Sequence, residues 1–240
     1  MATVTPHDAD HLAPICVWMA GGLDRAFELG AADLAGVPGT AEHAVDLGAG
    51  FGMHAIPLAR AGTRVLAIDT TEPLLASLAR SGRGLPVETV NADLADFASH
   101  SAAKPDLILC VGNALTHLAS PADVSAPMRA VAKRLCPGGS FLATLRDDRK
   151  LPTADNRFIS VRGDERRIHT CFLEEQPRHV IVHDLVHERV SDEWQLRVGS
   201  CPKLRLDPRE VLAFATAAGP KCRIEPGSRD MVKLGAGSTA

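Results

Sequence analysis

A glycine-rich turn between a short apolar run and a helical pattern constrains the fold of this chain more than any other feature. The run Ala-Val-Asp-Leu at 44–47 leads into Gly-Ala-Gly-Phe-Gly at 48–52, and a helical pattern follows at 53–60. Such a turn lets a ligand lie against bare backbone at the N-terminus of a helix. The segment therefore predicts a buried strand, a ligand-binding turn and a helix.

The spacing of the glycines separates two classes of cofactor. A dinucleotide-binding turn reads G-x-G-x-x-G, and its third glycine permits close packing of helix and strand. Here Met53 stands at that position, and glycine comes one residue earlier, at Gly52. The carboxylate of Asp46 would also repel a pyrophosphate, but not a cofactor that has an amino-acid tail and no phosphate. An NAD-dependent oxidoreductase is therefore kept only as an alternative.

The same segment resembles motif I of the class I S-adenosylmethionine methyltransferases. In that family the glycine loop meets the methionine part of the cofactor, and the acid before it lies close to the cofactor's charged groups. The resemblance implies cofactor contacts at Asp46, Gly48, Ala49, Gly50 and Gly52.

A second expected strand, residues 63–69, ends in Asp69, which follows the glycine turn at the spacing of a ribose-binding acid. An acid about 20 residues beyond such a turn can accept hydrogen bonds from ribose hydroxyls. The alternative is a helix N-cap, because Glu72 and Pro73 follow and proline favours a first helical turn.

Further landmarks of the family follow at the ends of later expected strands. Strand 86–90 precedes Asp93, which resembles the acid that meets the adenine amino group. Strand 105–111 leads into Gly112 and Asn113, and a Pro-Gly-Gly turn precedes strand 140–145. Asn113 could hydrogen-bond a ligand or cap a turn. The resemblance adds cofactor contacts at Thr70, Asp93, Leu94, Val111 and Asn113, and it covers roughly half the chain.

Four zones organise the chain. We expect a helical lead-in at 1–40, a Rossmann-like α/β core at 41–146, an antiparallel insertion at 147–205, and a closing helix with two strands at 206–240. The insertion is inferred from strands that follow one another without helices. Its expected strands are 157–161, 167–174, 179–190 and 193–198. The closing elements are expected at 207–218, 222–224 and 231–234.

The insertion after strand five resembles the antiparallel lid of glycine-type N-methyltransferases, which act on small amines. Ligands of an open α/β sheet bind outside the carboxyl ends of its strands, where this insertion would hang. We therefore predict a methyltransferase that transfers the methyl group of S-adenosylmethionine to a small polar metabolite by in-line displacement. A non-catalytic S-adenosylmethionine-binding module is a further alternative, because fold does not establish activity.

Three side chains are candidates for the substrate side of the site. His117 follows the fourth strand and could act as a base; otherwise it is a packed helix histidine. Trp18 could wall the methyl channel or hold a substrate cation, or else be a buried anchor. Arg146 ends strand five and could bind a substrate carboxylate, or pair with Asp147 or Asp148.

Two other patterns suggest chemistry that the neighbouring residues do not support. His183 and His187 have the spacing of a zinc-binding helix, but their flanks predict a strand, on which the rings would lie about 13 Å apart. No metal is therefore expected. The arginines at 162, 166 and 167 favour a solvated turn, with a clamp for an anionic substrate as the alternative.

Composition bounds the remaining possibilities. The 240 residues are 45% hydrophobic, enough for one α/β domain with additions. A net charge of −3 argues against a nucleic-acid partner. No apolar run reaches the length of a membrane span, and residues 1–10 carry no Lys or Arg, so we expect neither a membrane segment nor a secretory signal. Six scattered cysteines indicate reduced thiols in the cytoplasm. Oligomeric state is left open.

Overall fold

The protein contains two β-sheets. The computed structural model describes residues 7–35, 37, 41–148, 151–216, 222–228 and 231–236. The larger sheet has the strand order β10-β11-β5-β4-β1-β2-β3. Strands β1 to β5 are parallel, and β11 runs antiparallel to both β5 and β10. Its strands are β1 (His43–Leu47), β2 (Arg64–Asp69), β3 (Val87–Asn91), β4 (Leu107–Cys110), β5 (Ser140–Arg146), β10 (Cys222–Pro226) and β11 (Met231–Ala236).

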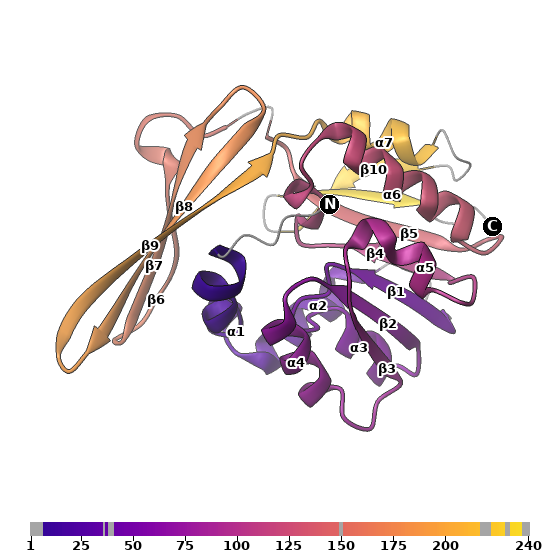
Figure 1. Ribbon diagram of the computed structural model, residues 1–240, viewed down its shortest axis with the longest axis horizontal. Helices are drawn as coiled ribbons and strands as arrows, with labels where there is room; N and C mark the ends of the chain where they lie inside the picture. Colours follow the sequence, from indigo (N-terminus) through magenta and orange to yellow (C-terminus); the bar gives the residue numbers. More distant parts are fainter. Residues whose placement is uncertain are drawn as a thin grey trace.

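Helices cover both faces of this sheet (Figure 1). Helices α2, α3 and α4 contribute to one apolar core, and α5, α6 and α7 contribute to the other. Strand β4 is buried along its whole length, as a parallel strand between two helical layers must be. The helices are α2 (Leu23–Asp33), α3 (Ala55–Arg60), α4 (Glu72–Ser81), α5 (Phe97–His100), α6 (Pro121–Arg134) and α7 (Pro208–Thr216), with 3₁₀ turns η3 (Leu94–Asp96), η4 (Ala114–His117) and η5 (Ala154–Arg157).

The smaller sheet is an antiparallel meander that follows β5 and projects from the main body (Figure 1). Its strands are β6 (Phe158–Gly163), β7 (Arg167–Glu175), β8 (His179–Val190) and β9 (Glu193–Leu204). The predicted end of the last strand at residue 198 was wrong, since β9 continues through Pro202 to Leu204. Proline is tolerated there because β9 is an edge strand, so the missing N–H breaks no second ladder.

An N-terminal segment, residues 7–19, lies between the smaller sheet and the main body (Figure 1). It consists of the π-helix η1 (His7–Leu12), the 3₁₀ turn η2 (Ala13–Ile15) and the short helix α1 (Cys16–Met19). Nε2 of His11 lies 3.1 Å from the backbone oxygen of Asp184 on β8. The segment also packs against β9 and α4, so it joins the two sheets.

The predicted fold class is confirmed: a Rossmann-like α/β sheet carries an antiparallel four-stranded sheet after strand five. None of the helices in the described residues is long and apolar enough to cross a membrane. The five cysteines that the structure describes in full (16, 110, 136, 171 and 201) are free.

Candidate functional site

The glycine turn after β1 is built from backbone conformations that side chains rarely adopt. Gly48, Gly50 and Gly52 have φ angles of 75°, 55° and 93°. A Cβ at Gly48 would lie 2.7 Å from the Cβ of Ala114, and one at Gly52 would lie 2.8 Å from Leu78. At Gly50 the nearest atom would be 3.9 Å away, so space is left beside this backbone. The first and third glycines therefore serve packing, and the middle one borders open space.

Asp69 at the end of β2 fastens the turn to its neighbour. One carboxylate oxygen accepts the N–H of Gly50 at 2.8 Å, and the other accepts the N–H of Thr71 at 2.7 Å. Thr71 occupies the N-cap position of α4, so Asp69 lies two residues before the cap and holds its N–H. Each carboxylate oxygen can accept more than one hydrogen bond, which leaves capacity for ligand hydroxyls.

Asp46 lies beneath the turn, with 1% of its surface exposed. Burial raises the pKa of its carboxyl group to about 6, while nearby His54 and the N–H of Ala55 lower it. Its Oδ2 atom has no hydrogen-bond partner in the described part of the chain. Leaving a buried carboxylate oxygen unpaired is costly, so this position favours a positively charged or donating group nearby.

A cavity of about 290 Å³ opens at this carboxyl edge of the sheet. It brings together seven of the predicted site residues: Gly48, Gly50, Asp69, Thr70, Leu94, Val111 and His117. The remaining lining residues were missed by the sequence analysis: Leu12, Cys16, Ile68, Thr71, Leu74, Ala92, Gly112, Ala114 and Lys203. The cavity is therefore lined by the core, the N-terminal segment and strand β9.

His117 and Lys203 meet at the wall of this cavity. Nζ of Lys203 lies 3.1 Å from Nδ1 of His117 and also contacts its Nε2. Both side chains line the cavity, so an imidazole and an amino group lie side by side at its wall.

Several predicted cofactor residues support the cavity from outside its lining. Ala49 donates its N–H to the oxygen of Ile68 at 3.0 Å, which holds the turn against β2. Asp93 caps η3 by accepting the N–H of Ala95 at 2.9 Å. Asn113 has a φ of 70°, and its side-chain oxygen accepts the N–H of Arg146 at 3.0 Å. Asn113 therefore braces the loop after β4 against β5, and its side chain does not cap η4.

Arg146 and Trp18 are also not among the residues that line the cavity. The charge of Arg146 lowers the pKa of Asp148, although burial raises that pKa overall, to about 6. This arrangement is close to the predicted alternative, in which Arg146 pairs with a neighbouring acid.

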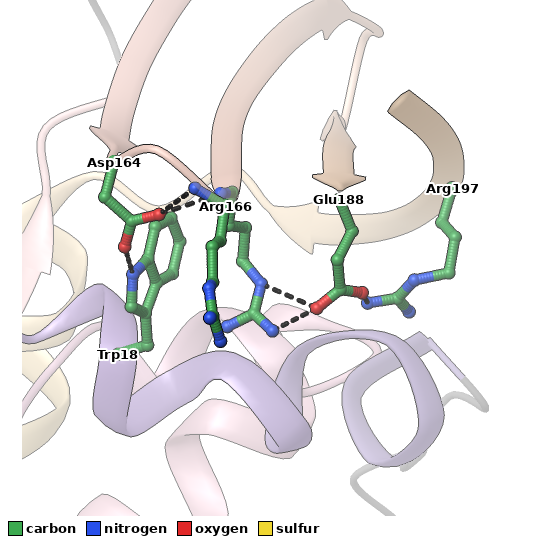
Figure 2. Close-up of polar contacts among 6 residues, drawn as sticks. Trp18, Asp164, Arg166, Glu188 and Arg197 are labelled. Atoms are coloured by element: carbon green, nitrogen blue, oxygen red, sulfur yellow. Dashed lines mark hydrogen bonds and ion pairs between the residues drawn. The ribbon is translucent and has the colours of Figure 1, made fainter. Parts of the chain in front are cut away.

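Trp18 joins the N-terminal segment to the turn between β6 and β7 (Figure 2). Its indole N–H donates to Oδ2 of Asp164, and guanidinium carbons of Arg162 and Arg167 lie 5.6 and 5.1 Å from its ring centre. Oδ1 of Asp164 accepts the backbone N–H groups of Arg166 and Arg167. The ring is thus already in contact with two protein cations.

The chain of charges continues along the same end of the sheet. Arg167 pairs with Glu188, whose other oxygen lies 3.6 Å from Arg197 (Figure 2). The arginine cluster therefore forms a turn that is bound to its own acids and to Trp18.

A second polar cluster lies on the side of the small sheet that faces the N-terminal segment. Oδ1 of Asp184 lies 2.6 Å from Nε2 of His169 and 2.8 Å from Sγ of Cys171. The cross-strand pairing of Cys171 with Asp184 brings these groups together. Their ligand atoms lie within 4.8 Å of one another, so the three residues could hold a metal ion. Hydrogen bonding of both neighbours to the same oxygen of Asp184 also explains the arrangement, without a metal ion.

Comparison with known proteins identifies the core. Residues 44–139 match the family model described as a methyltransferase domain. Cypemycin N-terminal methyltransferase from a Streptomyces species is 30% identical over 117 residues, which make up 49% of this chain and 47% of that protein. The chain therefore spans about half the length of the curated relative that it matches.

Solved structures resemble the whole chain. CcbJ methyltransferase from Streptomyces caelestis has a TM-score of 0.78 at 21% identity, covering 97% of this chain and 98% of its own. CalS10, an amino pentose methyltransferase from Micromonospora echinaspora, has a TM-score of 0.74 at 17% identity and covers 98% of both chains. The sugar N-methyltransferase KedS8 from Streptoalloteichus has a TM-score of 0.67 at 16% identity, covering 92% and 88%. At these identities the likeness establishes the fold.

Residues 44–139 thus match a methyltransferase domain, for which the sequence predicts S-adenosylmethionine as the cofactor. The site fits that cofactor in two observable respects. Gly50 leaves open space beside bare backbone, and the unpaired oxygen of Asp46 lies under the same turn. The predicted nearness to glycine-type enzymes is not confirmed, because the named relatives act on peptides and sugars.

Proposed function

We propose that this chain, with its methyltransferase domain at residues 44–139, transfers a methyl group from S-adenosylmethionine to an amino nitrogen of a small polar molecule. The observation that carries the proposal is that Asp69, proposed to bind the cofactor, and His117, proposed to accept a proton, line the same cavity. The nitrogen is inferred from the relatives, whose names specify a peptide N-terminus, an amino pentose and a sugar nitrogen.

The cofactor would be held mainly by the turn after β1 and the ends of β2 to β4. In this proposal the backbone at Gly48 and Gly50 receives its methionine part, and the carboxylate of Asp69 accepts its ribose hydroxyls. Leu94 and Val111 line the same cavity and provide apolar walls. When bound, S-adenosylmethionine supplies a methyl group made electrophilic by its sulfonium, so the protein has mainly to orient and enclose the reactants.

His117 would take the proton that an ammonium substrate must lose before its nitrogen can attack. Lys203 already places an ammonium group against this imidazole, so the position can receive an ammonium donor. We propose that the substrate ammonium takes the place of Lys203 at this nitrogen and gives its proton to the ring. A positioned base of this kind accelerates reactions by about 10²- to 10⁴-fold.

The four-stranded sheet would act as the cover of the substrate side, as expected for the segment 147–205. Lys203 of β9 and Leu12 and Cys16 of the N-terminal segment line the cavity, and Trp18 with Asp164 holds that segment to the sheet. Together these elements would exclude water from the reacting atoms. A covered cavity suits a small molecule or a peptide end better than a folded macromolecule.

Transfer of labelled methyl groups from S-adenosylmethionine to a substrate panel tests the proposal. The panel contains amino sugars and short peptides with free N-terminal amines, each matched with an analogue in which a hydroxyl replaces the amine. We expect label in the amines alone. Label in the hydroxyl analogues would contradict the nitrogen assignment, and tight cofactor binding without transfer to any substrate would support the binding-module alternative.

A further inference from the structure

Three side chains of metal-binding types meet on the side of the small sheet that faces the N-terminal segment. His169 and Cys171 belong to β7 and Asp184 belongs to β8, and none of them lines the proposed cofactor cavity. Side chains two positions apart on a strand point to the same side, and so do residues directly opposite each other on antiparallel strands. Since Cys171 lies opposite Asp184, the strand register brings all three side chains onto one face.

The ligand atoms of these side chains are close enough to share one ion. Sγ of Cys171 lies 3.6 Å from Nε2 of His169, and Oδ1 of Asp184 lies 2.6 Å from this nitrogen and 2.8 Å from this sulfur. Bonds of about 2.0–2.3 Å to a tetrahedral ion place its ligand atoms about 3.3–3.6 Å apart. The sulfur–nitrogen distance already has that length, and the other two need to lengthen by less than about 1 Å.

The burial and the chemistry of the cluster favour zinc. The side chains of His169 and Asp184 are 1% and 4% exposed, whereas Cys171 is only partly buried, so an ion can enter from its side. A buried carboxylate is stabilised by a positive charge close to it, which a divalent ion supplies. Imidazole, thiolate and carboxylate are all ligands of zinc, while magnesium and calcium prefer sites made of oxygen atoms.

We propose that His169, Cys171 and Asp184 bind a zinc ion, with a water molecule as its fourth ligand. In the metal-free chain, burial and the charge of Asp184 raise the pKa of Cys171, so its thiol keeps its proton and donates it to Oδ1 of Asp184. The ion takes the place of this proton, which passes to solvent as the bond between thiolate and zinc forms. The hydrogen-bonded cluster and the zinc site are therefore two states of the same three side chains.

The site lies where the N-terminal segment is fastened to the small sheet. Nε2 of His11 lies 3.1 Å from the backbone oxygen of Asp184, so the segment contacts the strand that carries one of the ligands. The same segment contributes Leu12 and Cys16 to the lining of the cavity. An ion that fixes Asp184 to β7 would therefore stabilise the cover of the cavity without touching the groups proposed to react.

Cobalt titration of the untagged, chelator-treated protein tests the site without cofactor or substrate, so the result does not depend on the proposed methyl transfer. Cobalt occupies zinc sites, and a bond between cobalt and thiolate absorbs strongly in the near ultraviolet. The wild type should gain this absorption up to one cobalt ion per chain, and added zinc should remove it. Cys171→Ala should lack the absorption. Cys136→Ala is the matched control and should keep it, because Cys136 is also a partly buried free cysteine but follows α6 in the main body.

Thermal unfolding of the wild type gives a readout that does not depend on the folding of any variant. A ligand that binds the folded state alone raises the Tm. A small excess of zinc should therefore raise the Tm of the chelator-treated protein, and the same concentration of magnesium should leave it unchanged. A wild type without the cobalt–thiolate absorption, a Cys171→Ala variant that keeps it, or a wild-type Tm that zinc does not raise would each overturn the proposal.

Discussion

The carboxylate of Asp69 accepts the backbone N–H of Gly50 at 2.8 Å, which ties the glycine turn to the end of the neighbouring strand. Its second oxygen accepts the N–H of Thr71 at the start of α4. One side chain thus fixes the two backbone segments that border the cavity. Its loss should change the shape of the site as well as remove an acceptor for the cofactor.

Asp69→Ala should weaken binding of S-adenosylmethionine by tenfold or more. A hydrogen bond to a charged group contributes about 1.5–3 kcal/mol, and the variant also releases Gly50 and Thr71. Calorimetric titration measures the affinity. Glu72→Ala is the control, since Glu72 is exposed at the start of the same helix. Unchanged affinity in Asp69→Ala would contradict the ribose assignment.

Gly50→Ala should abolish or strongly reduce cofactor binding in a folded protein. Its φ of 55° makes a side chain unfavourable by about 1–2 kcal/mol, and the added methyl group borders the space proposed for the ligand. Gly62→Ala separates these effects, because Gly62 also has a positive φ, 97°, and has no atom near its Cβ position. Both variants should lose stability, and only Gly50→Ala should lose binding. Equal cofactor affinity in Gly50→Ala and Gly62→Ala would show that the cofactor does not bind at this turn.

Asp46→Asn should be more stable than the wild type above pH 6 and similar to it near pH 4. Burial raises the pKa of Asp46 from 3.8 to about 6 in the folded state. The folded protein therefore holds an extra proton between these values, so the free energy of unfolding falls as pH rises through this window and then stays level. The full shift corresponds to about 3 kcal/mol. Asp148 titrates in the same range in both proteins and cancels in the difference.

Chemical denaturation of both proteins from pH 4 to 8 measures this difference. A constant difference in unfolding free energy across the range would show that Asp46 does not titrate as its burial implies.

His117→Gln should lower methyl transfer by about 10²- to 10⁴-fold with little change in cofactor affinity. Glutamine keeps hydrogen-bonding groups at the cavity wall and cannot take up the substrate proton. Single-turnover rates with an amine substrate separate the chemical step from binding. A parallel loss of cofactor affinity would instead place His117 among the cofactor contacts.

Lys203→Met should retain cofactor affinity and change the transfer rate by less than His117→Gln does. The lysine orients the imidazole and is displaced by substrate in the proposed mechanism, so it transfers no proton itself. If Lys203→Met lowers the transfer rate as much as His117→Gln does, proton uptake requires both side chains together.

Local features of the chain determined the main fold and the cofactor turn. Alternating apolar runs and helical patterns predicted the strands and helices of the core, because side-chain periodicity is a property of neighbouring residues. The glycines at 48, 50 and 52 identified the turn, since their positive φ angles are a local requirement of the backbone. Asp69 could be found for the same reason: it ends the next strand at a fixed spacing.

Only the tertiary structure decided how distant segments meet. Lys203 reaches His117 across 86 positions, and Trp18 reaches Asp164 across 146, so no local pattern could pair them. The sequence alone also could not show that β9 is an edge strand that tolerates Pro202. These outcomes follow from strand register and from the packing of the N-terminal segment on one face. Both are set by long-range contacts rather than by neighbouring residues.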